Sequence, residues 1–185
     1  MSQGSGLESQ VREYWDLDAA TYDRSPGHDP QTAMELAAWA ATLRRLLPAP
    51  PARVLDAGAG TGFLSLLLSR EGYRVTALDL APAMLSQLRA KAKDRGLSIE
   101  TVEGNAAEPP GDGYEAVVER HLVWTLPDPR AALGAWRRRA ARDARARRRC
   151  LGITSEPVGA ATCSRPGPSP AIAERALGTS RRVWR

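Results

Sequence analysis

The sequence predicts an α/β protein with a doubly wound parallel sheet, and three observations support this prediction. From residue 53 onward, short apolar runs alternate with stretches of helical periodicity. Three glycines lie within five positions after the first apolar run, in "DAGAGTG" at residues 56–62. The acidic residue Asp79 ends the next apolar run. This alternation is typical of a parallel sheet covered by helices on both faces.

The part of the chain before the first strand predicts two helices. They span residues 7–16 and 31–47, and the breaker-rich loop "SPGHDP" separates them. The proline-rich segment "LPAPPA", residues 47–52, ends the second helix because proline cannot continue it.

The remaining elements follow from runs of apolar residues and from their start and stop signals. Pro82 suits the first turn of a helix, and Gly96 suits its end. We predict strands at 53–57, 73–79, 97–104 and 114–121, and helices at 62–71, 81–96 and 128–140.

The glycine-rich loop could belong to three kinds of nucleotide-binding site. A P-loop requires Gly-Lys-Ser/Thr, but Phe63 follows Gly62. A dinucleotide fingerprint starting at Gly58 and Gly60 would need a third glycine at position 63. What remains is an acidic residue followed by glycine at every second position, which lets the backbone approach a ligand closely. The alternative is a tight strand–helix turn without a ligand.

Asp79 has two compatible interpretations. At the end of the second strand of a doubly wound sheet, a carboxylate lies beside the first loop and can accept hydrogen bonds from ribose hydroxyls. It also precedes Ala81 and Pro82, where it can cap a helix.

These motifs resemble those of class I S-adenosylmethionine-dependent methyltransferases, whose fold is Rossmann-like. The similarity extends to "EGNAAEPP" after the third strand and "VVERHLVWTLPDPRAAL" around the end of the fourth. It is greatest to the small-molecule branch typified by ubiquinone and menaquinone biosynthesis methyltransferases. In that branch a segment similar to "YWDLDAATYDRS" closes over the cofactor. The resemblance covers roughly residues 10–136.

The resemblance implies S-adenosylmethionine as cofactor and a role for several residues. Gly58 and Gly60 would contact its methionine part, with Asp56 nearby, and Asp79 would hold the ribose. Asn105 replaces the aspartate that usually contacts the adenine amino group, and its side-chain oxygen can still accept that bond. Tyr14 and Tyr22 either form a lid or pack in the core. The implied cofactor-binding residues are Tyr22, Asp56, Gly58, Gly60, Asp79, Leu80, Asn105, Ala106 and Glu119.

Methyl transfer needs alignment and water exclusion more than a fixed catalytic set. His121 is the candidate general base, or alternatively a hydrogen-bonded structural histidine. No Asn/Asp-Pro-Pro-aromatic tetrad follows the fourth strand and no Pro-Cys pair lies in the core, so we expect a small organic acceptor methylated on carbon, oxygen or nitrogen. Cys150 and Cys163 have no CxxC partner and predict no metal site.

The charge distribution divides the chain into two parts. Residues 1–136 contain 13 Lys and Arg against 18 Asp and Glu, a net charge of −5. Residues 137–185 contain 13 Arg against 3 acids, a net charge of +10, and eight of the 13 residues from Arg137 to Arg149 are arginine. We therefore predict a methyltransferase domain at 1–136, lacking the last strands of the usual seven, and an aberrant or disordered tail at 137–185.

The tail has two interpretations. Clustered arginine could bind nucleic acid or a membrane surface. Alternatively, a shift of reading frame near codon 137 in GC-rich DNA would yield this composition and would replace the fifth, sixth and seventh strands. We then expect strand 114–121 to form an open sheet edge and turnover to be weak or absent. The alternatives to an active enzyme are thus a cofactor-binding fragment or a nucleic-acid-binding protein. The sequence has no signal peptide and no apolar run of about 18 residues, so we expect a cytoplasmic protein without a membrane partner.

Overall fold

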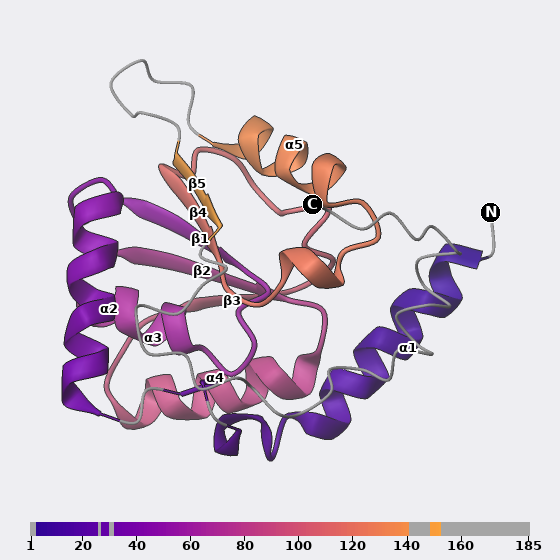
Figure 1. Ribbon diagram of the computed structural model, residues 1–185, viewed down its shortest axis with the longest axis horizontal. Helices are drawn as coiled ribbons and strands as arrows, with labels where there is room; N and C mark the ends of the chain where they lie inside the picture. The colour runs from indigo at the N-terminus through magenta and orange to yellow at the C-terminus, as the bar shows by residue number, and fades with distance from the viewer. Residues whose placement is uncertain (1–2, 26, 30–31, 141–148, 153–185) are drawn as a thin grey trace, which may run out of the picture.

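Five parallel strands form the centre of the fold in the computed structural model, which describes residues 3–25, 27–29, 32–140 and 149–152 (Figure 1). The strand order β3-β2-β1-β4-β5 confirms the predicted doubly wound sheet. The strands are β1 (Arg53–Ala57), β2 (Arg74–Asp79), β3 (Glu100–Glu103), β4 (Ala116–Glu119) and β5 (Arg149–Gly152).

The predicted helices are present, with small differences at their ends. The described helices are α1 (Gln3–Asp18), α2 (Ala33–Leu46), α3 (Phe63–Arg70), α4 (Pro82–Asp94) and α5 (Pro129–Arg139), with short 3-10 helices η1 (Tyr22–Arg24) and η2 (Val123–Thr125). Side chains cap two of them as their sequences suggest: Thr32 accepts from Glu35 N, and Asp128 accepts from Ala131 N.

Two strands are shorter than predicted because residues expected at their ends form local hydrogen bonds instead of pairing in the sheet. The amide of Leu97 donates to Ala92 O at 2.9 Å, so the chain is still completing the end of α4 where strand 97–104 was expected to begin. Strand β4 ends at Glu119 because the Glu119 side chain accepts from Leu122 N and Val123 N, which bends the chain into η2.

Alternate residues of the strands pack on opposite faces of the sheet. Val54 packs with α2 and α3 in one cluster, which includes the buried Trp39 of α2. Leu55 packs on the other face, in the cluster that contains Trp136 of α5. The Trp136 indole is fully buried and donates from Nε1 to Ala106 O at 2.6 Å. Both faces of β1 are therefore covered, as its apolar run requires.

The expectation that β4 forms the edge of the sheet is wrong. Strand β5 pairs with β4 in parallel, with Ala116 opposite Arg149 and Glu119 opposite Gly152. The run "LGIT" at 151–154 was the one strand-like segment of the tail, and the strand forms two residues earlier, starting at Arg149, the last residue of the arginine-rich run. Most of the predicted tail, and any sixth or seventh strand in it, lies outside the described residues, and the boundary at residue 136 stays a prediction.

The register of the sheet brings the carboxyl ends of its strands together. Ala57 lies opposite Leu78 of β2 and Glu119 of β4, and Asp79 lies opposite Glu103 of β3. The chain leaves β1 toward β2 and β3 and later returns to β4 on the other side of β1. Ligands of doubly wound sheets bind at this switch point, outside the carboxyl ends of the strands.

The turn from β1 into α3 leads to a testable prediction about the thermal stability of the protein. Gly62 has a φ of +96°, and a Cβ there would lie 2.6 Å from Leu88 Cγ. Gly96 has a similar φ of +63°, but a Cβ there would meet nothing within 4 Å. We expect Gly62→Ala to lower the melting temperature more than Gly96→Ala, because the φ strain is common to both and the clash adds about 1–3 kcal/mol. Thermal melts of the two variants test this, and equal losses would contradict it.

Candidate functional site

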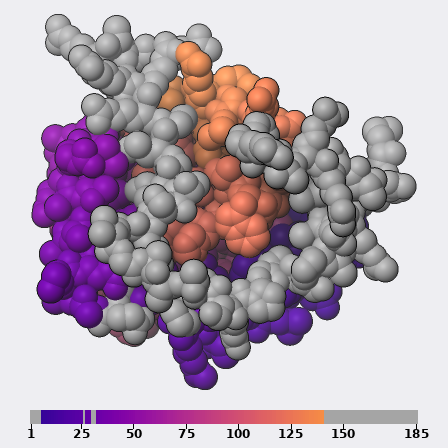
Figure 2. Space-filling view, viewed as in Figure 1, coloured from indigo at the N-terminus to yellow at the C-terminus, as the bar shows by residue number. Residues whose placement is uncertain are grey.

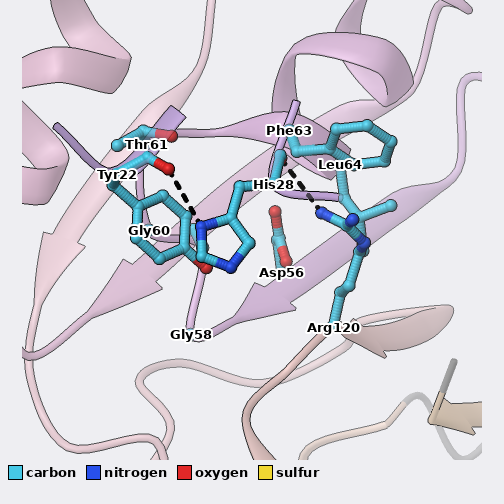
Figure 3. Close-up of a pocket in the computed structure, with 10 residues that line it drawn as sticks. Tyr22, His28, Asp56, Gly58, Gly60, Thr61, Phe63, Leu64 and Arg120 are labelled. Atoms are coloured by element: carbon cyan, nitrogen blue, oxygen red, sulfur yellow. Dashed lines mark hydrogen bonds between the residues drawn. The ribbon is translucent and has the colours of Figure 1, made fainter. Parts of the chain in front are cut away.

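A pocket lies at the carboxyl ends of β1 and β4, and three separate segments build it (Figure 3). One is the loop after β1, the second is the segment that follows β4, and the third comes from the N-terminal part of the chain. Figure 2 shows atoms of the coral and the indigo parts of the chain on the same face of the molecule. The lining residues are Tyr22, His28, Asp56, Gly58, Ala59, Gly60, Thr61, Phe63, Leu64 and Arg120.

The glycine loop is held by the neighbouring strand. The amides of Gly58 and Ala59 both donate to Leu78 O, at 2.8 and 3.0 Å. Gly58 has a φ of +70°, and a Cβ there would lie 2.9 Å from Leu122 Cδ1, so packing requires this glycine. Gly60 has a φ of +54°, and a Cβ there would meet only the Tyr22 ring, at 4.0 Å. Gly60 therefore leaves space on the pocket side, where a ligand can approach the backbone.

The Asp79 carboxylate joins this loop to the start of α4. Its Oδ2 accepts from Gly60 N at 2.7 Å, and its Oδ1 accepts from Ala81 N at 2.9 Å. The expectation that Asp79 caps the helix is wrong, because Ala81 is the N-cap residue of α4 and no side chain caps that helix; the second bond joins Asp79 to the residue that precedes Pro82. Burial raises the pKa of Asp79, and the backbone donors partly oppose that rise. Each carboxylate oxygen has a further lone pair for a ligand hydroxyl.

Two more carboxylates lie next to the loop. Asp56 is 2 % exposed, and its Oδ2 accepts from Ser65 Oγ at 2.6 Å. Burial raises the pKa of Asp56 to about 7, with smaller contributions from the charges of Asp79 and Glu119. Glu119 is fully buried, and its Oε1 has no hydrogen-bond partner among the described residues. Burial also raises the pKa of Glu119. Burial thus disfavours the ionised forms of these carboxyl groups, and a cationic ligand beside them would favour ionisation.

Arg120 lines the pocket, and the resemblance had implied this position only as part of the run 119–121, expected to line the sulfonium side of the cofactor. Its guanidinium lies 4.1 Å from the centre of the Phe63 ring and 5.4 Å from that of Trp39. It donates to the carbonyl oxygens of His28, at 3.2 Å, and Gly27. Arg120 therefore fixes the N-terminal segment against the end of β4 while it presents a cation to the pocket.

Further contacts hold η1 over the glycine loop. Asp23 accepts from Thr61 Oγ1 at 2.5 Å and forms an ion pair with Lys91 Nζ at 2.5 Å. The Tyr22 ring lies beside Gly60, and burial raises the pKa of the Tyr22 hydroxyl to about 12. Tyr22 lines the pocket and also packs against the core cluster of Ala19, Ala81 and Met84, so its role as a lid stays a prediction. Tyr14 packs edge-on against Trp15 in α1 and does not line the pocket.

Helix α1 also covers the ends of the outer strands. Glu8 accepts from Asn105 Nδ2 at 3.1 Å, and Arg12 forms an ion pair with Glu103 at 2.6 Å. The Asn105 Oδ1 accepts from Ala107 N at 2.9 Å, so the amide proposed to face adenine already has partners on both ends.

The other residues implied by the resemblance lie around the pocket and not in its lining. Leu80 is half-buried directly after Asp79. Ala106 is a core residue whose carbonyl accepts from Trp136. These contacts leave the ligand roles proposed for Leu80, Asn105 and Ala106 as predictions.

The two histidines of the chain meet at the pocket. The His28 and His121 rings lie 5.7 Å apart, although 92 residues separate them in the sequence. His121 has a φ of 65°, and burial, helped by Arg120 and His28, lowers its pKa to about 4. His121 is not a lining residue, whereas His28 is. In the sequence, His28 had appeared only as part of a breaker-rich loop.

The middle of the chain matches a known family. Residues 54–143 match the family described as "Methyltransferase domain". Over 90 residues the chain is 39% identical to the ubiquinone biosynthesis O-methyltransferase of Xanthomonas campestris pv. campestris strain B100, covering 46% of this chain and 37% of that protein. Over 97 residues it is 35% identical to the enzyme of the same name from Xylella fastidiosa strain 9a5c, covering 50% and 39%. The chain thus spans well under half the length of these relatives.

Solved structures share the fold. The DhpI-SAM-HEP complex is 29% identical, with a TM-score of 0.55, covering 76% of this chain and 63% of that one. Magnesium protoporphyrin IX methyltransferase from Synechocystis PCC 6803 is 21% identical, with a TM-score of 0.60 and 72% of each chain covered.

None of the helices in the described ranges combines the length and the apolar character that a membrane span requires.

Because Asp56 is buried, the stability of the folded protein should depend on pH in a way that can be tested. The folded protein keeps the Asp56 proton up to about pH 7, whereas the unfolded chain loses it near the ordinary value of 3.8. Ionisation between these values therefore favours unfolding. As pH rises from 5.5 to 8.5, we expect the melting temperature of Asp56→Asn to increase relative to that of the unsubstituted protein. Each kcal/mol of stability that the unsubstituted protein loses corresponds to about 2–4 °C.

The exposed Asp94 gives the matched control, since Asp94→Asn removes the same charge at the surface. Thermal melts without ligand measure both variants across the range. A melting-temperature difference between Asp56→Asn and the unsubstituted protein that stays constant with pH would contradict the prediction.

Proposed function

From the methyltransferase domain that residues 54–143 carry, we propose that this chain transfers a methyl group from S-adenosylmethionine to a small organic acceptor. The observation that carries the proposal is the arrangement of Gly60, Asp79 and Asp56 at the switch point of the sheet. The coverage of the relatives is partial, so the acceptor and the activity of this chain are part of the proposal.

The charge of the pocket fits this cofactor. Bound S-adenosylmethionine supplies an electrophilic methyl group on a positively charged sulfur, and its methionine end carries an ammonium and a carboxylate. The buried Asp56, which lines the pocket, suits the positive groups. Arg120 lines the pocket as a cation, and a guanidinium suits the carboxylate.

The ribose end of the cofactor would meet Asp79. Because its two oxygens are already oriented by Gly60 N and Ala81 N, the carboxylate is held in place before a ligand arrives. Its remaining lone pairs would accept from the two ribose hydroxyls. The same hydrogen bonds fix the glycine loop, so the ribose and methionine parts would bind to a single rigid unit.

The chain's own contribution to the reaction is alignment and exclusion of water. The ion pair of Asp23 with Lys91 and the bonds from Arg120 hold Tyr22 and His28 over the loop. A cover of this kind keeps water from the reacting atoms and orders them for in-line displacement.

The names of the relatives favour oxygen as the methylated atom, which had been left open among carbon, oxygen and nitrogen. The nucleic-acid-binding alternative finds no support in the comparisons. Its arginine-rich segment lies largely outside the described residues.

A titration with S-adenosylhomocysteine tests the proposal. We expect saturable binding to the unsubstituted protein and at least tenfold weaker binding to Gly60→Ala, because the added Cβ occupies pocket space beside Tyr22. Gly96→Ala is the matched control: it has the same kind of φ strain, in open space far along the chain from the pocket. Isothermal titration calorimetry measures all three. Absence of binding, or equal weakening in both variants, would count against the proposed site.

A further inference from the structure

We propose that the end of the sheet opposite the pocket binds the phosphate backbone of a nucleic acid duplex. At this end, six exposed arginines form no ion pair among the described residues. We call this surface the arginine edge, and it consists of Arg45, Arg53, Arg70, Arg74, Arg137 and Arg138. The proposal is independent of the methyltransferase function, because it concerns the other end of the strands.

The course of the chain gathers these arginines at one end of the molecule. Helices that connect parallel strands run back along the sheet, so they end where strands begin. Arg45 lies in the last turn of α2, and Arg70 in that of α3. Arg137 and Arg138 lie in the last turn of α5. Figure 1 shows the ends of α2 and α5 beside the amino ends of the strands.

Arg53 and Arg74 are the arginines that most clearly indicate a partner. They begin β1 and β2 and lie directly opposite each other in the parallel register. Neighbouring strands are about 4.8 Å apart, so two like charges are held side by side. Such a pair is destabilising unless an anion neutralises it. Attraction to helix carboxyl ends accounts for arginines in last turns, but not for these two, which begin strands.

The acidic side chains at this end do not supply the missing negative charge. Glu71 and Asp112 are each paired with an arginine outside the set of six, Glu71 with Arg44 and Asp112 with Arg139. The Glu115 side chain accepts from the backbone amide that begins β1, at 2.9 Å. The six arginines of the edge therefore remain available for an external anion.

The distribution of charge also favours binding at this end. Residues 1–136 carry a net charge of −5 although they include four of the six arginines, so the rest of this part is more acidic still. Strand β2 shows the polarity directly, because it begins with Arg74 and ends with Asp79 beside the glycine loop. A polyanion would be attracted to the edge and repelled from the pocket. A bound duplex would thus leave the pocket open to small ligands.

The extent of the edge fits a polymer of phosphates. The strands from β2 through β1 and β4 to β5 span three strand spacings, about 15 Å, and the helix ends add to this width. A DNA duplex carries one negative charge per about 1.7 Å of its axis, so several phosphates can lie along the edge. Guanidinium groups bind phosphate oxygens in pairs, which suits an edge built of arginine.

The other side chains of the edge argue against a membrane or a single strand. The exposed large apolar residues are Leu17, Met34, Trp124 and Leu133. None of them lies at the amino end of a strand or in the last turn of α2, α3 or α5. Surfaces that bind membranes add apolar anchors to their cations, and surfaces that bind single strands add aromatic rings for the bases. The described part of the edge offers charge alone, which matches the backbone of a duplex.

A fluorescently labelled DNA duplex tests the proposal by anisotropy, with the full chain and no other ligand. Each contact between an arginine and a phosphate releases counterions, so the affinity falls as the salt concentration rises. For the unsubstituted protein we expect saturable binding that weakens steeply between about 50 and 200 mM salt.

The double variant Arg53→Gln/Arg74→Gln removes the in-register pair. We expect about tenfold weaker binding at low salt and a log–log salt slope that is shallower by about 2, because two phosphate contacts are lost. The matched control is Arg24→Gln/Arg89→Gln, which removes two exposed arginines outside the edge and changes the net charge equally. Arg53→Lys/Arg74→Lys keeps both charges and should keep the salt slope. Thermal melts check that each variant is folded.

The proposal is wrong if the unsubstituted protein does not bind the duplex saturably, or if the edge and control variants weaken binding equally. All variants retain the arginines of residues 141–148, so binding through that segment alone would leave the edge variant unchanged and would also overturn the proposal. Anionic phosphatidylglycerol vesicles form the last arm. If the edge variant loses binding to vesicles while no form of the protein binds the duplex, the partner is a membrane surface and not a nucleic acid.

Discussion

The carboxylate of Asp79 is the interaction on which the site depends. It accepts from Gly60 N in the loop after β1 and from Ala81 N at the start of α4, so one side chain links two strand–helix connections. Parallel pairing of β1 with β2 places Asp79 beside the loop, and the bonds from Gly58 and Ala59 to Leu78 complete the attachment. A glycine-rich loop is free to take many conformations. These contacts select the single one that has space on its pocket side.

Without a ligand, the buried carboxyl groups around the glycine loop reduce the stability of the folded protein. Burial raises the pKa values of Asp56, Asp79 and Glu119, because each carboxylate is removed from water, and for Asp56 and Asp79 nearby acids add to the rise. A protein designed only for stability would avoid this arrangement. A cationic ligand would offset this free-energy cost, because its positive charge would lie beside the carboxylates. Stability and ligand binding are therefore opposed at this site, as is common where function requires buried charge.

The sequence predicted the parts of this site that depend on local pattern. The apolar runs located β1 to β4, and the spacing of Gly58, Gly60 and Asp79 located the loop and its acidic partner. Arg120 and His28 could not be found this way, because their roles arise from contacts between segments about 90 residues apart. The start of strand β5 was misjudged because Arg149 and Cys150 precede the short apolar run that begins at Leu151, whereas pairing with β4 includes both residues in the strand.

The N-terminal segment and the glycine loop are joined at the pocket by contacts from several sides. The Tyr22 ring lies beside Gly60 and stacks on the His28 ring, and the Tyr22 carbonyl oxygen lies 2.9 Å from His28 Nδ1. Arg120, which follows β4, donates to the carbonyl oxygens of Gly27 and His28. A ligand that approached the backbone of Gly60 would therefore also meet side chains of the N-terminal segment and of the segment after β4. Binding at the loop and the position of the N-terminal segment are coupled for this reason.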